Sequence, residues 1–268
     1  MRCMQSRRRA VPLALAAICV WQVSRSFVAG AASQTARQVT LARHADADGF
    51  KLRYFDAKGA AETIRLVFAA AGKDYEDMRY PISFGTPGDF STIVRKEFEA
   101  DRDAGKMDIS MGKVPVLDVG DFSLPQSKAI ERYVARKVGM MGSTAEEEAL
   151  VDAMAEHVRD VNDAYNRKGL FFMKDEEKKA ELKKKWYEEE LPPLLTKLDT
   201  ALPGSDGFAV GKKVSLADVA IFKLLKDTYD QDVSDAYKSC PKLQAIVSSL
   251  EKNDGIKKWL EERPKTFI

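Results

Sequence analysis

The sequence predicts a small α/β domain over residues 47–138, followed by an all-helical domain over residues 145–268. Three observations lead to this fold class. Strand-like and helix-like stretches alternate up to residue 138, whereas apolar residues beyond residue 145 recur only at helical spacing. The stretch between them, residues 139–144, is predicted to be a linker. A chain of 268 residues is long enough for both parts and a substantial core.

The α/β part begins with residues 50–55, whose apolar and polar side chains alternate as in a strand. A helix over residues 60–71 and a strand over residues 75–80 come next, and a strand–helix–strand unit favours parallel pairing. The remaining elements are predicted in this order: a helix near 90–104, strands over 114–118 and 122–124, and a helix over 126–138. The resulting order β-α-β-α-β-β-α predicts a mixed sheet.

The helical part begins with a long helix that has a shared apolar face, made of Leu150, Met154, Val158, Val161 and Tyr165. Residues 175–200 predict a second long helix, bent or interrupted at Pro192-Pro193, with the Lys/Glu run 174–185 as its solvated face. Ser215 to Asp218 form a capping box with Asp in place of the usual Glu. Two shorter helices should follow, and Pro264 marks the end of the last.

Residues 1–46 differ from the rest and are predicted to be a targeting leader outside the fold. An Arg triplet at 7–9 precedes an apolar run at 10–23, which is short for a membrane span and typical of a signal-peptide core. The following stretch, which opens on Phe27, has Arg but no acid until Asp46, as in a transit peptide. This composition resembles the two-part plastid leaders of algae. We expect a plastid location, with the secretory pathway and the mitochondrion as alternatives, and no stable membrane insertion once the leader is removed.

Charge and cysteine content exclude several classes. Without the leader the chain holds 36 basic residues (43 minus 7) and 40 acidic residues (41 minus 1), and it shows no basic patch interleaved with aromatic residues. Nucleic acid is therefore not expected as a partner. Of the three cysteines, Cys3 and Cys19 belong to the leader, so Cys240 has no internal disulfide partner and is expected to be structural. Because His157 is the one histidine after the leader, we expect no metal site.

The stretch at Val114-Pro115 is unusual, because proline removes a hydrogen-bond donor from a strand. A proline that opens a strand can leave the N–H and C=O of the preceding residue free for a ligand. Gln126-Ser127 falls where a helix should begin, and a helix N-terminus attracts carboxylates. Together these stretches predict a site for an extended peptide with a free carboxylate.

With these motifs, Tyr54-Phe55 on the first strand, Ala61-Glu62 after it and the Ser215 capping box, the chain resembles cytosolic glutathione transferases over residues 50 to about 262. The resemblance is strongest to the sigma class, which includes the glutathione-dependent prostaglandin D synthases. It implies a thioredoxin-like βαβαββα domain followed by an all-helical domain, glutathione as co-substrate, and a homodimer.

The resemblance implies that the Tyr54 hydroxyl donates a hydrogen bond to the sulfur of glutathione. A free thiol has a pKa near ~8.5 and is mostly protonated at neutral pH. A donor that favours the thiolate lowers this pKa and produces the nucleophile. From spacing alone, the favoured role of Tyr54 is a packed strand aromatic.

The remaining glutathione contacts are implied in the same way. The Val114 backbone should pair with the cysteinyl part, and Pro115 is a candidate for a cis peptide bond. Gln126 and Ser127 should receive the γ-glutamyl carboxylate, with plain helix capping as the alternative. Lys113 should meet the glycyl carboxylate, with a solvated lysine as the alternative.

Other assignments rest on weaker matches. Asp160 is expected to reach glutathione from the neighbouring subunit, and Phe90 and Lys96 are expected at its glycyl end. The predicted electrophile pocket contains Lys58, Asn162 and Tyr165.

The sequence also departs from the family pattern. Lys58-Gly59-Ala60 replaces an Arg-Gly-Arg stretch, and the connection over residues 81–112 is longer than usual. Arg159 replaces an acid, and Arg167 stands where some prostaglandin synthases have Trp.

We therefore expect a glutathione transferase that conjugates glutathione to small apolar electrophiles. A glutathione-dependent isomerase or peroxidase is the first alternative, and a non-catalytic ligand-binding or structural relative is the second. The presence of Tyr54, Val114-Pro115 and Gln126-Ser127 argues against the second, because a structural protein does not need them.

Overall fold

The computed structural model describes residues 49–86 and 90–266. The predicted leader, residues 1–46, lies outside the described residues. The α/β part contains β1 (Phe50–Phe55), α2 (Glu62–Ala71), β2 (Glu76–Tyr80), β3 (Ser83–Phe84), β4 (Ile93–Val94), α3 (Lys96–Asp103), β5 (Val116–Val119), β6 (Phe122–Pro125) and α4 (Ser127–Lys137). The helical part contains α5 (Ala145–Asn166), α6 (Glu176–Lys185), α7 (Leu191–Ala201), α8 (Leu216–Asp227), α9 (Pro241–Glu251) and α10 (Asp254–Glu262).

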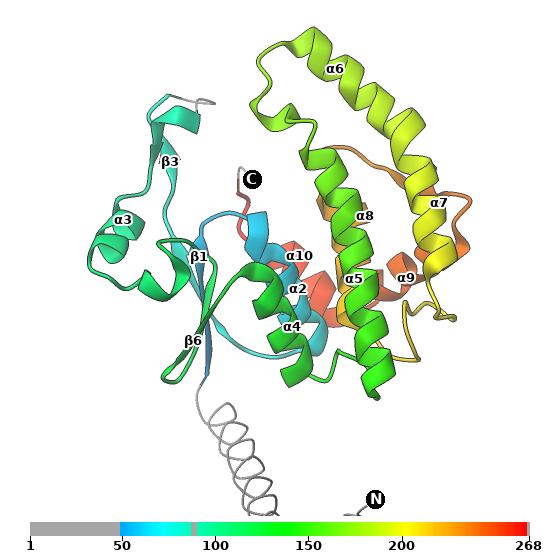
Figure 1. The fold of residues 1–268 in the computed structure, drawn as a ribbon, viewed down its shortest axis with the longest axis horizontal. Helices are drawn as coiled ribbons and strands as arrows, with labels where there is room; N and C mark the ends of the chain where they lie inside the picture. Colours follow the sequence, from blue (N-terminus) through cyan, green and yellow to red (C-terminus); the bar gives the residue numbers. More distant parts are fainter. Residues whose placement is uncertain (1–48, 87–89, 267–268) are drawn as a thin grey trace, which may run out of the picture. The chain divides into compact units, whose positions relative to one another are not determined.

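The central sheet has the strand order β2-β1-β5-β6. β1 and β2 are parallel, as predicted, whereas β5 pairs antiparallel with both β1 and β6. The helices α2 and α4 lie on one side of this sheet and α3 on the other (Figure 1). Phe50 faces α2, where its ring lies 5.3 Å from that of Phe68, and Phe55 faces α3, where its ring lies 5.0 Å from that of Phe98. The predicted mixed sheet is confirmed.

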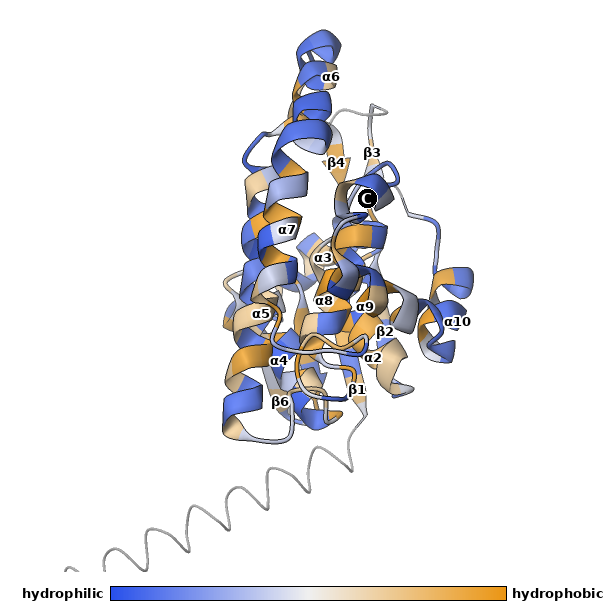
Figure 2. Cartoon of the chain, turned by 90° about the vertical axis from the view of Figure 1, so that its right-hand side faces the viewer, coloured by the Kyte–Doolittle hydropathy of each residue, from blue (hydrophilic) through white to orange (hydrophobic). Residues whose placement is uncertain are grey.

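The helical part is organised around α8. Most of its side chains are buried, and it packs against α5, α9 and α2. Figure 2 shows the polar colour concentrated on α6, whose Lys/Glu run has no buried residue, as predicted for a solvated face. The predicted capping box is present. The Ser215 side chain accepts from the Asp218 N–H, and the Asp218 side chain accepts from the Ser215 N–H. No helix among the described residues combines the length and apolar character needed to cross a membrane.

Several predicted boundaries are wrong for local reasons. The helix predicted near residues 90–104 is short: residues 90–92 form a single 3-10 turn, residues 93–94 pair with β3, and only Lys96–Asp103 is α-helical. The predicted helix over 60–71 begins with a 3-10 turn at Gly59–Ala61. The interruption in the second long helix is a π-helical turn at Trp186–Glu190, placed so that the prolines fall in the first turn of α7. Proline is tolerated in a first turn because its missing N–H would have no helical partner there.

The predicted apolar face of the first long helix is correct except at its ends. Met154, Val158 and Val161 are buried, and Tyr165 is partly buried. Leu150 is 41% exposed, and Val151 takes its place in the core. A one-residue rotation of the face in the second turn explains the difference, since neighbouring helical positions point about 100° apart.

Candidate active site

Two strand ladders end at the same place. The pairing of β1 with β5 ends at Arg53 and Val116, and the pairing of β5 with β6 ends at Val116 and Pro125. The residue after Arg53, the residues before Val116 and the residues after Pro125 therefore reach one end of the sheet. These residues are Tyr54, Val114-Pro115 and Gln126-Ser127. The three predicted motifs, up to 73 positions apart in the chain (127 minus 54), are brought together by strand register.

The Tyr54 hydroxyl lies against the turn that follows β1. Its oxygen accepts a hydrogen bond from the Ala60 N–H at 3.1 Å. A Cβ at Gly59, which has a φ of 40°, would lie 2.5 Å from this oxygen, so only glycine fits beneath the hydroxyl. A tyrosine hydroxyl both accepts and donates. With an acceptor position occupied by the Ala60 N–H, its proton is available to a third group.

Val114 lies just outside the sheet. The Val114–Pro115 peptide bond is cis, as proposed from the sequence, and β5 begins only at Val116. The Val114 N–H and C=O therefore take no part in the strand ladders. Pro115 is buried and Val114 is partly buried, so the backbone is anchored at the point where it is unpaired.

The start of α4 has an unusual backbone. Gln126 has φ 75° and ψ 111°, a region that side-chain-bearing residues rarely occupy, and such strain recurs at ligand sites. Its side chain makes no cap hydrogen bond, which speaks against plain capping. The first N–H groups of α4, beginning at Ser127, are thus open to an anion.

The residues predicted for the outer contacts are exposed. Lys96, Lys113 and Asp160 are all exposed, and within the described residues none has a hydrogen bond or ion pair from its side chain. These side chains are free to meet a ligand or a second subunit. The side chain of Phe90 lies outside the described residues.

Two predicted electrophile-pocket residues meet the C-terminal end of α8. Lys58 Nζ pairs with Asp227 Oδ1 at 3.2 Å. The Tyr165 ring lies 5.1 Å from the Tyr229 ring, in an aromatic cluster that also includes Trp186. Lys58 is therefore a partner of Asp227 as well as a neighbour of the predicted site.

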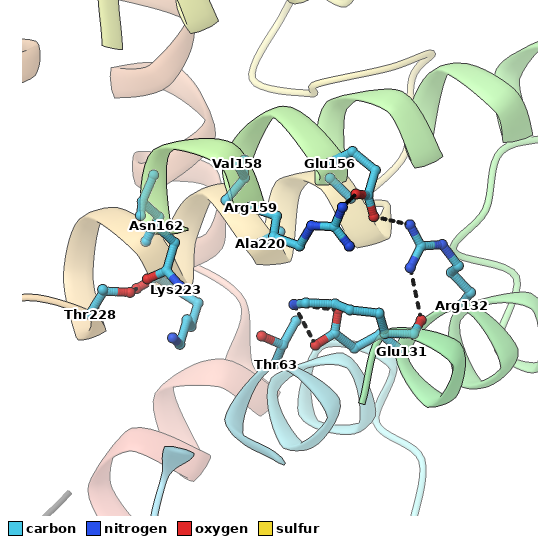
Figure 3. Close-up of a pocket in the computed structure, with 13 residues that line it drawn as sticks. Thr63, Glu131, Arg132, Glu156, Val158, Arg159, Asn162, Ala220, Lys223 and Thr228 are labelled. Carbon is cyan, nitrogen blue, oxygen red and sulfur yellow. Dashed lines mark hydrogen bonds and ion pairs between the residues drawn. The ribbon is translucent and has the colours of Figure 1, made fainter. Parts of the chain in front are cut away.

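Asn162 lines a different feature, a polar pocket between α2, α4, α5 and α8 (Figure 3). Its volume of about 40 Å³ suits water, not an electrophile. Lys128 Nζ pairs with Glu131 at 2.9 Å, and Arg132 pairs with Glu156. Burial raises the pKa of the Glu131 carboxyl, against the opposing effect of Lys128. The pocket is a small polar gap between helices.

Sequence reasoning missed two groups beside Tyr54. The Ala60 N–H leaves no sequence signal, because every residue except proline has one. Arg65 is fully buried and donates from Nη1 to the Ala57 carbonyl at 2.6 Å. Arg65 lies three positions after Glu62 on a predicted helix, which places the two side chains side by side. This spacing could have indicated a buried ion pair, since buried charges need partners.

Two family models match the chain. One is the glutathione S-transferase N-terminal domain over residues 50–136, and the other is the glutathione S-transferase C-terminal domain over residues 162–263. The chain is 35% identical to the hematopoietic prostaglandin D synthase of Gallus gallus over 227 residues, 82% of this chain and 98% of that protein. The chain belongs to the glutathione S-transferase family. The predictions of the family, of its thioredoxin-like and helical parts and of its transferase activity are confirmed.

Other glutathione S-transferases are similar over the same range. A Plasmodium falciparum glutathione S-transferase is 32% identical and covers 82% of this chain and 98% of its own length. A monomeric glutathione S-transferase of Necator americanus has a TM-score of 0.64 at 29% identity, covering 82% of this chain and all of its own. Glutathione is the co-substrate of this family. No cluster of potential metal ligands occurs among the described residues.

Proposed function

We propose that this glutathione S-transferase binds glutathione at the end of the sheet where Tyr54, Val114 and Ser127 meet, and adds its sulfur to small apolar electrophiles. The supporting observation is the Tyr54 hydroxyl, which accepts from the Ala60 N–H at 3.1 Å and keeps its proton for the thiol sulfur. A hydrogen bond to the thiolate lowers the thiol pKa, and one unit corresponds to about 1.4 kcal/mol.

The peptide backbone of glutathione suits the gap left beside β5. The free N–H and C=O of Val114 offer two hydrogen bonds to the cysteinyl residue, as in strand addition. The γ-glutamyl carboxylate then reaches the N-terminus of α4, where Gln126 and Ser127 lie. Lys113, exposed beside Val114, meets the glycyl carboxylate. Lys96 and Phe90 are proposed to contact the same end of glutathione.

The reaction is nucleophilic displacement or addition. With an aryl chloride, the thiolate forms a carbon–sulfur bond, the carbon–chlorine bond breaks and chloride leaves. Holding both reactants together supplies proximity, and Tyr54 supplies the ionised sulfur. The electrophile is proposed to lie near Tyr165, whose aromatic cluster offers an apolar surface.

A glutathione-dependent isomerase is the second candidate, favoured by the similarity to a prostaglandin D synthase. Two features weigh against it. Lys58, which replaces the first Arg of the family's Arg-Gly-Arg stretch, is paired with Asp227. Arg167 stands in place of the pocket-lining Trp of some prostaglandin synthases.

We further propose a homodimer in which Asp160 reaches glutathione bound to the other subunit. Its exposed position on α5 and its lack of a partner among the described residues agree with this role. We also propose delivery to a plastid by residues 1–46. A fluorescent protein fused to this leader tests the location, and accumulation in the mitochondrion or the secretory pathway would contradict it.

The proposed function is tested by assaying purified protein with glutathione and three electrophile classes: chlorodinitrobenzene, an organic hydroperoxide and a prostaglandin endoperoxide. We expect retention on immobilised glutathione and fastest turnover with the aryl chloride, with the thioether product identified by mass spectrometry. Absence of retention and of all three activities would contradict the site assignment. Turnover of the endoperoxide alone would establish the isomerase instead.

A further inference from the structure

The C-terminal helix α10 is joined to α2 by close contacts. A Cβ at Gly255 would lie 1.9 Å from the Ala69 carbonyl oxygen, so the two backbones nearly touch. The Asn253 side chain donates to the Ala70 carbonyl at 3.2 Å. The last turn of α10 lies near the other end of α2, where Trp259 Nε1 donates to Glu62 Oε1 at 2.8 Å. Helix α10 is therefore held along the length of α2.

Glu62 is the centre of a buried set of charges. It is 1% exposed, and its Oε1 also accepts from Arg263 Nη1 at 2.8 Å. Its Oε2 lies 3.4 Å from Arg65 Nη1. Arg263 also pairs with Asp227, which in turn pairs with Lys58. Several donors hold the buried carboxylate of Glu62 in place. Loss of one donor is costly, because it leaves part of the carboxylate's charge without a partner.

Arg65 connects this set of charges to the turn beneath Tyr54. The same Nη1 that faces Glu62 donates to the Ala57 carbonyl at 2.6 Å and approaches the Lys58 carbonyl at 3.5 Å. Its guanidinium lies 5.9 Å from the centre of the Tyr54 ring. Two of its acceptors thus belong to the turn that ends with the Ala60 N–H, the donor to the Tyr54 hydroxyl.

We infer that Trp259 and Arg263 are positioning residues for thiol activation, acting through Glu62 and Arg65 on the turn that orients the Tyr54 hydroxyl. This inference rests on the proposed role of Tyr54. The C-terminal segment thereby helps to set the ionisation of a thiol bound beside the N-terminal end of α2, where Trp259 and Arg263 contact Glu62. Loss of either donor leaves Glu62 with fewer partners, and the turn then holds the hydroxyl less firmly.

The test measures the pKa of the glutathione thiol from the pH dependence of kcat/KM with chlorodinitrobenzene. We expect Arg263→Gln and Trp259→Phe each to raise this pKa by about half a unit to one unit. That shift corresponds to roughly a threefold to tenfold loss of kcat/KM at a pH below the pKa. Arg263→Lys retains the cation and should recover part of the shift. Lys258→Gln, an exposed change on the same helix, should leave the pKa unchanged.

A purely structural role predicts a lower melting temperature with an unshifted thiol pKa, and this result would overturn the inference. Tyr54→Phe is measured in the same series to separate the role of Tyr54 from the positioning role of Trp259 and Arg263. If Tyr54→Phe raises the pKa and neither Arg263→Gln nor Trp259→Phe does, only the positioning role fails. If Tyr54→Phe leaves the pKa unchanged, the proposed function fails first.

Discussion

The Tyr54 hydroxyl can both accept and donate a hydrogen bond, and among the described residues it only accepts one. The Ala60 N–H fixes the oxygen, and Gly59 leaves room for it. The proton remains available to a ligand bound at this end of the sheet. The strand pattern alone would assign Tyr54 to packing. The turn next to it positions the hydroxyl so that it can act on a ligand.

Ser127 allows a direct test of the carboxylate site. We expect Ser127→Ala to raise the KM for glutathione about tenfold with a smaller change in kcat, because one hydrogen bond to a charged group contributes about 1.5–3 kcal/mol. Steady-state kinetics with varied glutathione measure the effect. Ser143→Ala, at an exposed position of the predicted linker, is the matched control. An unchanged KM in Ser127→Ala would remove Ser127 from the site.

The site residues differ in how far the sequence could predict them. Val114-Pro115 and Gln126-Ser127 were predictable, because proline and a helix start have physical signatures. Tyr54 needed the family resemblance, since strand periodicity alone favours a packed aromatic. The Ala60 N–H was not predictable, because its role depends on turn geometry that side-chain identity does not encode.

At the scale of elements, the close packing of α10 against α2 requires a glycine at position 255. Gly255→Ala would place a methyl group 1.9 Å from the Ala69 carbonyl oxygen and should cost about 2–3 kcal/mol of unfolding free energy. Denaturant unfolding measures this loss. Gly49→Ala is the control, because nothing lies within 4 Å of its added Cβ. Equal stability of the two variants would contradict the close approach of the helices.

The first turn of α8 gives a pH-dependent prediction. Burial raises the pKa of Asp218 from 3.8 to about 6, although Ser215 and the Ala209 N–H donate to it. The folded state therefore binds this proton more tightly than the unfolded state. The stability from this group is present below about pH 4 and is lost as the pH rises through 6.

We therefore expect the unfolding free energy of the wild type, relative to Asp218→Asn, to fall by up to roughly 3 kcal/mol between pH 4 and pH 7 and then to stay constant. Denaturant titrations at several pH values measure the difference. A constant difference from pH 4 upward would show that Asp218 keeps an ordinary pKa. Asp206→Asn, an exposed change nearby, should show no such pH dependence.

Elements with strong periodicity were predicted well, and those fixed by tertiary contacts were not. The strand at residues 50–55 and the capping box at Ser215 were found at their predicted positions. The sequence pattern predicts one helix near residues 90–104, but residues 93–94 pair with β3, a partner that no local pattern reveals. Leu150 was placed in the core because helical spacing alone does not separate it from Val151.

At the scale of the whole molecule, Asp160 is proposed to contact glutathione bound to the other subunit of a homodimer. We expect Asp160→Asn to raise the KM for glutathione severalfold while the protein still sediments as a dimer. Analytical ultracentrifugation and glutathione kinetics measure the two properties. The neighbouring Asp163→Asn is the control on the same helix. A monomer that binds glutathione normally would contradict both the dimer and the role of Asp160.

The domain limits 47–138 and 145–268 and the targeting leader stay predictions. The leader is predicted from composition, because an acid-free, Arg-bearing stretch differs from the balanced charge that follows. The assembly of the site from three motifs required strand register, which sequence patterns do not specify beyond neighbouring elements.

The most direct test of the account is the ionisation of the bound thiol in the wild type and in Tyr54→Phe. The thiolate absorbs in the ultraviolet, so a pH titration of the glutathione complex gives its pKa. We predict a wild-type pKa at least about one unit below the ~8.5 of a free thiol, and a value close to the free thiol in Tyr54→Phe. Equal pKa values in the two proteins, with glutathione bound in both, would contradict the central claim.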